Sequence, residues 1–187
     1  MTKLIEFNTE RLRLRQWNDV DRAPFASLNA DPRVMEFFPR PLDRESSDVM
    51  ADRIQSQIAE RGWGLWAVEI RESKKFIGFI GLNIPPPELP FSPCIEIGWR
   101  LAVEYWGKGY AVEGARGALR VGFEMLALPE IVSFAALGNV RSRAVMKKLG
   151  MLDTGTVFEH PLLDENAPLR EHCLYRLSLG QWQGIVS

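Results

Sequence analysis

The sequence predicts a single α/β (or α+β) domain in which helices pack on a mixed, mainly antiparallel sheet of seven strands. Short runs rich in aliphatic and aromatic residues alternate with segments whose apolar residues recur at helical spacing. Their order, β-α-α-β-β-β-α-β-α-β-β, is typical of a sheet covered by helices. A chain of 187 residues can bury one substantial core, so we expect one domain over residues 1–187.

Seven segments have the composition and period of strands. The first, Arg11–Arg15, alternates strictly, which predicts that Leu12 and Leu14 point inward. The next two are expected to form a hairpin around Glu72–Lys75. Pro85–Pro90 is expected to form an exposed loop because proline does not fit a helix interior or a central strand. The other six predicted strands are Leu65–Ile70, Phe76–Leu82, Cys94–Leu101, Ile131–Ala136, Thr154–Phe158 and His172–Leu179.

Four helices are predicted between these strands. Asp21 can cap a short first helix, and a second is expected over Asp43–Arg61. The third follows Gly109, and the fourth begins at the N-cap Asn139 and ends at Gly150. The apolar positions of the second helix are Val49, Met50, Ile54 and Ile58, and an exposed ladder of ion pairs is expected on the third from Glu113, Arg116, Arg120 and Glu124.

Composition argues against several classes of protein. The net charge of −1 and the pI of about 6.2 do not suit a nucleic-acid binder. No apolar run approaches the length of a membrane span, and Met1–Glu6 lacks a signal-peptide core, so we expect a cytoplasmic protein without membrane contact. The two histidines and two cysteines lie far apart, so no metal site is expected.

The most specific motif lies between the strand Cys94–Leu101 and the third helix. Gly107 and Gly109 allow the main chain to approach a phosphate closely, and the N–H groups of a following helix turn favour negative charge. A P-loop would need Ser or Thr after a Gly-Lys pair, but Gly109 follows Lys108. A dinucleotide fingerprint would need glycine where Val112 stands.

The same turn resembles the coenzyme A pyrophosphate loop of acetyltransferases, Arg/Gln-x-x-Gly-x-Gly/Ala. Read over Trp106–Ala111, only the first position departs from that pattern. Three further segments match in order and spacing, and together the four resemble the GNAT superfamily of acyl-CoA N-acyltransferases, closest to its ribosomal-protein-alanine acetyltransferase-like branch. These segments are Ile95–Leu101, Asn139 with Ser142, and Val145–Met151.

The resemblance implies that backbone N–H groups of the glycine turn bind the pyrophosphate of coenzyme A. Trp106 stands where the family usually has Arg or Gln. The pyrophosphate therefore has to be held by the backbone of the glycine turn, called the cradle below, with Lys108 as a flexible charge beside it. The implied residues are Gly107, Lys108, Gly109, Tyr110 and Ala111.

The resemblance also implies a sheet splayed between its fourth and fifth strands, here Cys94–Leu101 and Ile131–Ala136. In the family, a bulge in the fourth strand separates the two, and the pantetheine arm pairs with the exposed edge. A backbone N–H there would stabilise the oxyanion formed from the thioester. The matching residues are Leu101, Ala102 and Val103.

An amine has to lose a proton when it attacks a thioester, so a base is needed. Glu96 matches the fourth-strand glutamate often proposed for this role, although it could instead pair with Arg100 on the same face of the strand. His160 and His172 are further candidates for the base, with a structural or surface role as the alternative.

The leaving thiolate benefits from a proton donor, and the resemblance implies Ser142 for this role. The alternative is a first-turn serine that hydrogen-bonds to backbone. Asn139 is expected both to cap its helix and to contact the pantetheine or the sulfur environment. Phe37, Phe38 and the loop Pro85–Pro93 are expected to line the entrance for the acceptor.

These expectations describe an acetyl-CoA-dependent N-acetyltransferase without a metal. Acetyl-CoA would be the co-substrate, and a primary amine would attack it directly in a ternary complex. The acceptor could be a protein N-terminal amine or a small-molecule amine. A non-catalytic acyl-CoA-binding or sensing domain and an acyltransferase for longer acyl-CoAs remain as alternatives. We expect a monomer or homodimer with no nucleic-acid or membrane partner.

Overall fold

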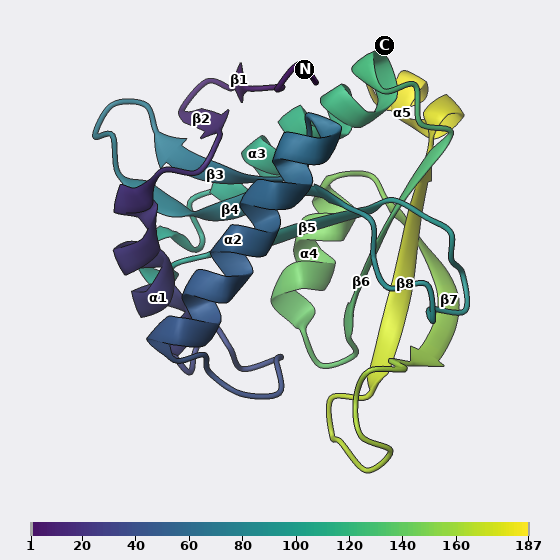
Figure 1. Ribbon diagram of the computed structural model, residues 1–187. Coiled ribbons are helices and arrows are strands. Elements are labelled where there is room, and N and C mark those ends of the chain that lie inside the picture. Colours follow the sequence, from purple (N-terminus) through teal and green to yellow (C-terminus); the bar gives the residue numbers. More distant parts are fainter. Residues whose placement is uncertain (1, 187) are drawn as a thin grey trace.

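The computed structural model describes residues 2–186 and shows one eight-stranded sheet with helices on both faces (Figure 1). The strand order is β1-β2-β3-β4-β5-β6-β8-β7, and every neighbouring pair is antiparallel except β5 and β6. The predicted class is confirmed, with one strand more than expected because the two-residue β1 is too short to show a period. The strands are β1 Phe7–Asn8, β2 Leu12–Arg15, β3 Leu65–Ile70, β4 Phe76–Asn83, β5 Glu96–Leu101, β6 Glu130–Ala136, β7 Leu152–Glu159 and β8 Glu171–Ser178.

The helices form two layers around this sheet. One face is covered by the first two helices, and α2 crosses in front of the sheet in Figure 1. The other face carries α3 together with α4 and α5. None of the helices in residues 2–186 combines the length and apolar character that a membrane span requires. The helices are α1 Arg22–Ala30, α2 Arg44–Arg61, α3 Tyr110–Arg120, α4 Val140–Lys148 and α5 Leu179–Val186, and α5 was not predicted.

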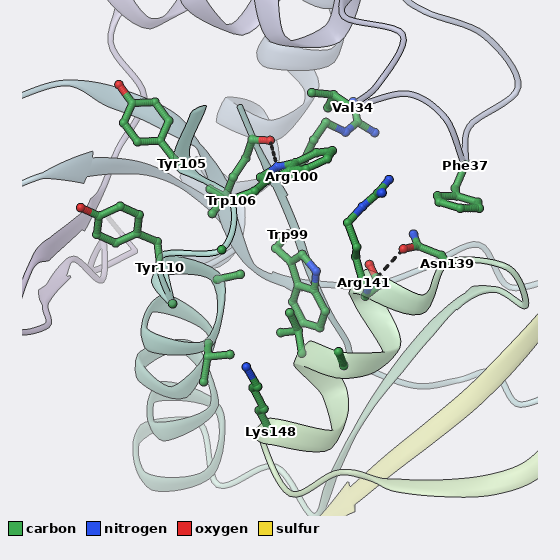
Figure 2. Close-up of a pocket in the computed structure, with 18 of the residues that line it drawn as sticks. Val34, Phe37, Trp99, Arg100, Tyr105, Trp106, Tyr110, Asn139, Arg141 and Lys148 are labelled. Atoms are coloured by element: carbon green, nitrogen blue, oxygen red, sulfur yellow. Dashed lines mark hydrogen bonds between the residues drawn. The ribbon is translucent and has the colours of Figure 1, made fainter. Parts of the chain in front are cut away.

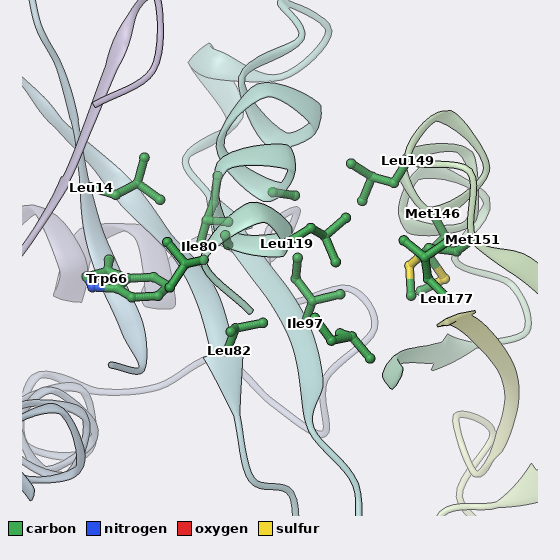
Figure 3. Packing of buried hydrophobic residues seen from close by; sticks show 14 of the residues in the cluster. Leu14, Trp66, Ile80, Leu82, Ile97, Leu119, Met146, Leu149, Met151 and Leu177 are labelled. Carbon is green, nitrogen blue, oxygen red and sulfur yellow. The ribbon is translucent and has the colours of Figure 1, made fainter. Parts of the chain in front are cut away.

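The larger core lies between the sheet and α3 (Figure 3). Trp66 and Ile80 from the central strands meet Leu119 of α3, and each of these side chains is almost fully buried. Toward the C-terminal half, Met146 of α4 packs with Leu177 of β8 in the same cluster. This continuous core fixes where α3 and α4 begin relative to the sheet, and both helix starts border the pocket described below.

Helix α2 begins and ends where predicted, but its buried face differs. The carboxylate of Asp43 accepts a hydrogen bond from the Ser46 N–H at 2.8 Å, and Gly62 ends the helix in the left-handed conformation with φ of 85°. The predicted apolar position Val49 is 63% exposed, whereas Ser47 is buried. The buried stripe is rotated because the hydroxyl of Ser47 satisfies a buried amide from α1.

Two acidic residues have roles that the sequence analysis did not predict. Asp21 precedes α1 as predicted but makes no side-chain cap on that helix. Its carboxylate instead accepts two hydrogen bonds from Arg15 at 2.7 and 2.9 Å and one from the Asn18 N–H at 2.8 Å. Arg15 is only 5% exposed and also binds Glu69, so the ion pairs satisfy a buried guanidinium. Glu113 does not join an ion-pair ladder on α3, because it accepts hydrogen bonds from the side chain and backbone of Arg11 at 2.6 and 2.7 Å.

The parallel strands β5 and β6 are paired at one position only, Glu96 with Val132. The N–H of Val132 donates to the Ile95 carbonyl at 2.9 Å, and the hydroxyl of Ser133 donates to the Ile97 carbonyl at 2.9 Å. Each strand keeps its antiparallel partner on the other side along its whole length. The predicted splay between these strands is therefore confirmed, and it opens toward their C-terminal ends.

The bulge expected in the strand that precedes the glycine turn is not found in its pairing with β4. The register runs without interruption from Glu96 to Leu101. The irregularity lies instead in β4, where Ile77 is the extra residue between the pairs Val68–Gly78 and Glu69–Phe76. The splay therefore arises because β5 and β6 follow different partners.

The close approach of β3 and β4 predicts a strong effect of Gly81→Ala. A Cβ at this position would overlap the carbonyl oxygen of Gly64 and lie 2.8 Å from the Cα of Leu65, and backbone cannot yield as a side chain can. We expect a loss of about 2 kcal/mol in the free energy of unfolding, measured by urea denaturation. Gly180→Ala in α5 is the control, because nothing lies within 4 Å of the added methyl group. Equal stability of the two variants would contradict the prediction.

Candidate active site

A pocket of about 390 Å³ opens where the two parallel strands separate (Figure 2). Its walls come from the loop between α1 and α2, the end of β5, the glycine turn with the start of α3, and α4. Trp99 of β5 projects between α3 and α4, and Lys148 reaches the same space from the end of α4 (Figure 2). Three parts of the chain that are far apart in sequence thus meet at one site.

The glycine turn forms one wall of this pocket. Gly107 and Gly109 have φ of 71° and 82°, a backbone conformation that side chains with a Cβ rarely adopt. Gly109 is the N-cap of α3, so the unpaired N–H groups of the first helical turn face the turn. Nothing lies within 4 Å of the position a Cβ on Gly107 would occupy, which leaves open space beside the backbone. Tyr110 and Ala111 also line the pocket, but Lys108 does not.

A cation that the sequence analysis missed lies beside the turn. Arg11, at the start of β2, donates a hydrogen bond from Nη1 to the Lys108 carbonyl at 3.0 Å. Its guanidinium carbon lies 4.5 Å from the centroid of the Tyr110 ring. No local pattern reveals this contact, because almost one hundred residues separate the two segments. Arg11 therefore holds the turn in place and adds positive charge next to it.

Trp106 turns away from the cradle and braces the pocket mouth. Its indole N–H donates to the Leu101 carbonyl at 2.7 Å, and the guanidinium of Arg141 lies 4.7 Å from its ring centroid. Arg141 comes from the first turn of α4 and forms an ion pair with Glu36. Arg141 also lies 5.7 Å from the ring centroid of Phe37. Three segments of the pocket wall are thereby linked around one guanidinium.

Of the three residues expected to meet the pantetheine arm, only Leu101 lines the pocket. The N–H of Ala102 donates to the Ile77 carbonyl at 3.0 Å, so this donor is not free to face a thioester. Val103 opens a short 3-10 turn, and with Ala102 it packs against the core beneath α1 and α2. The prediction for Ala102 is therefore wrong with respect to a free N–H, because β4 already binds it.

Glu96 lies at the closed end of the splay, outside the pocket lining. Burial raises the pKa of Glu96 from 4.5 to about 7, and a hydrogen bond with Asn83, opposite on β4, only partly counters this rise. Its Oε1 lies 3.8 Å from where a Cβ on Gly98 would stand. The alternative in which Glu96 pairs with Arg100 is wrong, because Arg100 donates instead to the side-chain oxygen of Asn29 at 2.7 Å.

Asn139 and Ser142 both line the pocket at the start of α4. The side-chain oxygen of Asn139 accepts a hydrogen bond from the backbone N–H of Ser142 at 3.0 Å, which confirms the predicted N-cap. The hydroxyl of Ser142 makes no hydrogen bond to any residue in the described range 2–186. It is therefore available to a ligand in the pocket.

The two histidines lie apart from this pocket. The rings of His160 and His172 are 5.0 Å apart and pack against Phe134 and Phe158. Burial lowers the pKa of both histidines, and the charge of His172 lowers the pKa of His160 further. Neither side chain lines the pocket, which favours the structural alternative.

Only some of the residues that were expected to line the entrance for the acceptor line the pocket. Phe37 and Phe38 line it, whereas no residue of Pro85–Pro93 does. Sequence reasoning also missed Arg100 and Arg141 as pocket residues, since each looks like an ordinary strand or helix charge. In residues 2–186, no group of three His, Cys, Asp or Glu side chains is placed to hold a metal ion.

Comparisons with known proteins agree with this architecture. The family model of the acetyltransferase (GNAT) domain matches residues 11–152. An uncharacterized Bacillus subtilis (strain 168) protein, YkkB, is 33% identical over 159 residues, which cover 83% of this chain and 88% of YkkB. The FsC-acetyl coenzyme A-N(2)-transacetylase of Aspergillus fumigatus is 34% identical over 158 residues, 81% of this chain and 66% of that protein.

A solved structure extends the likeness to three dimensions. The acetyltransferase from Agrobacterium tumefaciens str. C58 superposes with a TM-score of 0.75 at 29% identity, covering 95% of this chain and 96% of that one. The family match spans the glycine turn, the splayed strands and α4, the segments that form the pocket. This chain therefore belongs to the GNAT acetyltransferase family and is an acetyl-CoA-dependent N-acetyltransferase.

Proposed function

We propose that the protein transfers the acetyl group of acetyl-CoA to a primary amine by direct attack within a ternary complex. The observation that carries the proposal is the convergence of the glycine turn, the open end of β5 and the start of α4 on one pocket. The turn offers backbone donors to a pyrophosphate, and the start of α4 offers a free hydroxyl. Both substrates of the reaction can meet in this space.

The turn suits the donor substrate on physical grounds. Open space beside Gly107 and the first-turn N–H groups after Gly109 match a group with two neighbouring phosphates. Lys148 adds positive charge at one side of this region, and Arg11, which is paired with Glu113, holds the turn in place. We assign the pyrophosphate of acetyl-CoA to residues 107–111, with Lys108 contributing through its backbone.

The reaction replaces a carbon–sulfur bond by a carbon–nitrogen bond. The amine nitrogen attacks the thioester carbonyl and gives up one proton, and the departing thiolate takes up one proton. Glu96 accepts the amine proton through water, because its carboxylate lies outside the pocket lining but has a pKa of about 7. Ser142 donates to the thiolate through its free hydroxyl, with Asn139 fixing the backbone around it.

The acceptor is a primary amine of a small molecule or of a protein N-terminus. The name of the Aspergillus relative describes transfer to a nitrogen atom, which supports an amine acceptor. A panel of amino acids, polyamines, peptides and amino sugars, each offered with acetyl-CoA and followed by released thiol, tests the proposal. Succinyl-CoA and a long-chain acyl-CoA are run in parallel. Binding of acetyl-CoA without thiol release from any amine would contradict catalysis.

The first prediction concerns the cradle, through Gly109→Val. A β-branched residue disfavours φ of 82°, so the turn would change shape and its N–H groups would no longer converge. We expect the dissociation constant for acetyl-CoA to rise about tenfold or more by calorimetry. Gly155→Val is the matched control, since Gly155 has φ of 70° in β7 and nothing within 4 Å of an added Cβ. Unchanged affinity in the Gly109 variant would refute the assignment.

The second prediction concerns Glu96→Gln. We expect kcat to fall about a hundredfold or more at about pH 8, because a positioned base is lost. In the wild type, kcat/KM should rise with pH through about 7 as Glu96 loses its proton, and this step should vanish in the variant. Using one amine for both proteins cancels the ionisation of the amine itself. A loss of activity below about tenfold would exclude the base role.

Stability provides an independent check on the same variant. The folded-state pKa of about 7 lies above the ordinary value of 4.5, so the folded protein holds its proton where the unfolded chain has lost it. Wild-type stability should therefore decrease as pH rises from 4.5 to about 7, and Glu96→Gln should remove this decrease. Urea denaturation at several pH values measures the difference.

The third prediction concerns Ser142→Ala. Alanine keeps the backbone N–H that Asn139 binds, so the helix start and acetyl-CoA affinity should be preserved. We expect kcat to fall about tenfold or more because the thiolate loses its donor. The fall in kcat should be smaller when the acetyl group is supplied by a thioester whose thiol is more acidic. Wild-type activity in the alanine variant would show that the hydroxyl is not needed.

A further inference from the structure

Arg100 is a buried cation without a counter-charge. It is 8% exposed, projects from β5 and lines the pocket. No carboxylate in residues 2–186 lies within ion-pair distance of its guanidinium, whereas the other buried arginine, Arg15, binds both Asp21 and Glu69. A buried charge with no opposite charge is costly, so its presence requires an explanation.

The hydrogen bonds of Arg100 are also incomplete. Nη1 donates to the side-chain oxygen of Asn29 at 2.7 Å and lies 3.7 Å from the sulfur of Met50. Nε is buried with no hydrogen-bond partner, and Nη2 has none among the described residues. Nη2 is therefore the nitrogen free to donate to a carboxylate oxygen, and Nε lies next to it on the same edge of the guanidinium.

Aromatic rings hold the guanidinium in this position. Its central carbon lies 4.1 Å from the ring centroid of Phe38 and 5.4 Å from that of Phe79. Rings on its faces leave only its edges for hydrogen bonding. Burial, together with the smaller effect of the nearby charge of Arg53, lowers the pKa of Arg100 to about 10. A bound anion would relieve both effects.

On the basis of the proposed function, we propose that the acceptor amine carries a carboxylate and that Arg100 binds this carboxylate. Arg100 directly precedes Leu101, which is the residue of the open β5 end that lines the pocket. An acceptor that binds Arg100 through its carboxylate and presents its amine at the end of β5 would carry these two groups a short distance apart. This geometry describes a compact amino acid or a peptide whose N-terminal residue is acidic.

The surroundings of Arg100 support an anion in this part of the pocket. Gly98 separates Arg100 from Glu96 on the same face of β5, and only Glu96 Oε1 lies within 4 Å of where its Cβ would be. The second guanidinium of the pocket is that of Arg141 (Figure 2), and it is already paired with Glu36. Arg100 is thus the guanidinium of the pocket that has no carboxylate partner within residues 2–186, and Glu96 lies on the side where the amine would lose its proton.

The test compares acceptors that differ only in charge. Amino acids with one to three carbons between amine and carboxylate are assayed beside their carboxamides, with spermidine and N-terminally acidic peptides as further arms. We expect the wild-type kcat/KM to favour the carboxylate over its carboxamide by about tenfold to a hundredfold. The peptide arm distinguishes a free amino acid from a protein N-terminus. Equal rates for carboxylates, carboxamides and spermidine would overturn the proposal while leaving amine acetylation intact.

The variant Arg100→Met then assigns the preference to this side chain. We expect it to lower kcat/KM for the carboxylate acceptor about tenfold or more, through KM, with less than about a threefold change for the carboxamide. Acetyl-CoA affinity should stay unchanged, as in the control Arg120→Met on the exposed side of α3. An equal loss for both acceptors would show that Arg100 is structural. If Arg100→Met is unfolded by circular dichroism, the wild-type comparison alone decides the proposal.

Discussion

The structure depends on the separation of two neighbouring parallel strands that share a single paired position. Strands β5 and β6 diverge while each stays fully paired with its antiparallel partner on its other side. Backbone N–H and C=O groups need partners, so those that face the gap have to find partners other than the neighbouring strand. The separation leaves main-chain groups at the C-terminal end of β5 available to a ligand. It also places the starts of α3 and α4 on the two sides of the opening. A single constraint on pairing thus creates the pocket and selects the helix ends that border it.

Local features of the sequence were sufficient for most of the framework. The start of α2 at Asp43, the helix cap at Asn139 and the glycine turn depend on residues within a few positions of one another, and all three were predicted. The prediction that Val49 lies on the buried face of α2 was wrong, because contacts with α1, a separate segment, decide which face is buried. The strand bulge was placed on the wrong strand for the same reason, since strand register is a property of pairs.

The contacts of the charged residues in the site also join separate segments, so local sequence could not predict them. Arg11 and Glu113 are separated by about one hundred positions, and each has an ordinary local pattern, as a strand end and an exposed helix face. Their contact ties the N-terminal strand to the helix that bears the cradle, which explains why the turn keeps its shape without an arginine at position 106. Arg100 was considered only as a partner for Glu96. Its actual partners, Asn29 and two phenylalanines, come from elements that no spacing rule connects to β5.

Glu96 and Arg100 share one face of β5, and burial moves both toward their neutral forms. The pKa of the carboxyl rises to about 7 and that of the guanidinium falls to about 10. The shifts have a common cause, since neither group has an opposite charge from the chain to stabilise it. An acceptor with an ammonium group and a carboxylate would supply the opposite charge to each. Binding would then favour the charged forms of both residues, and the ammonium would lie within reach, through water, of the carboxylate that removes its proton. Substrate recognition and activation of the base would therefore be two consequences of the same burial.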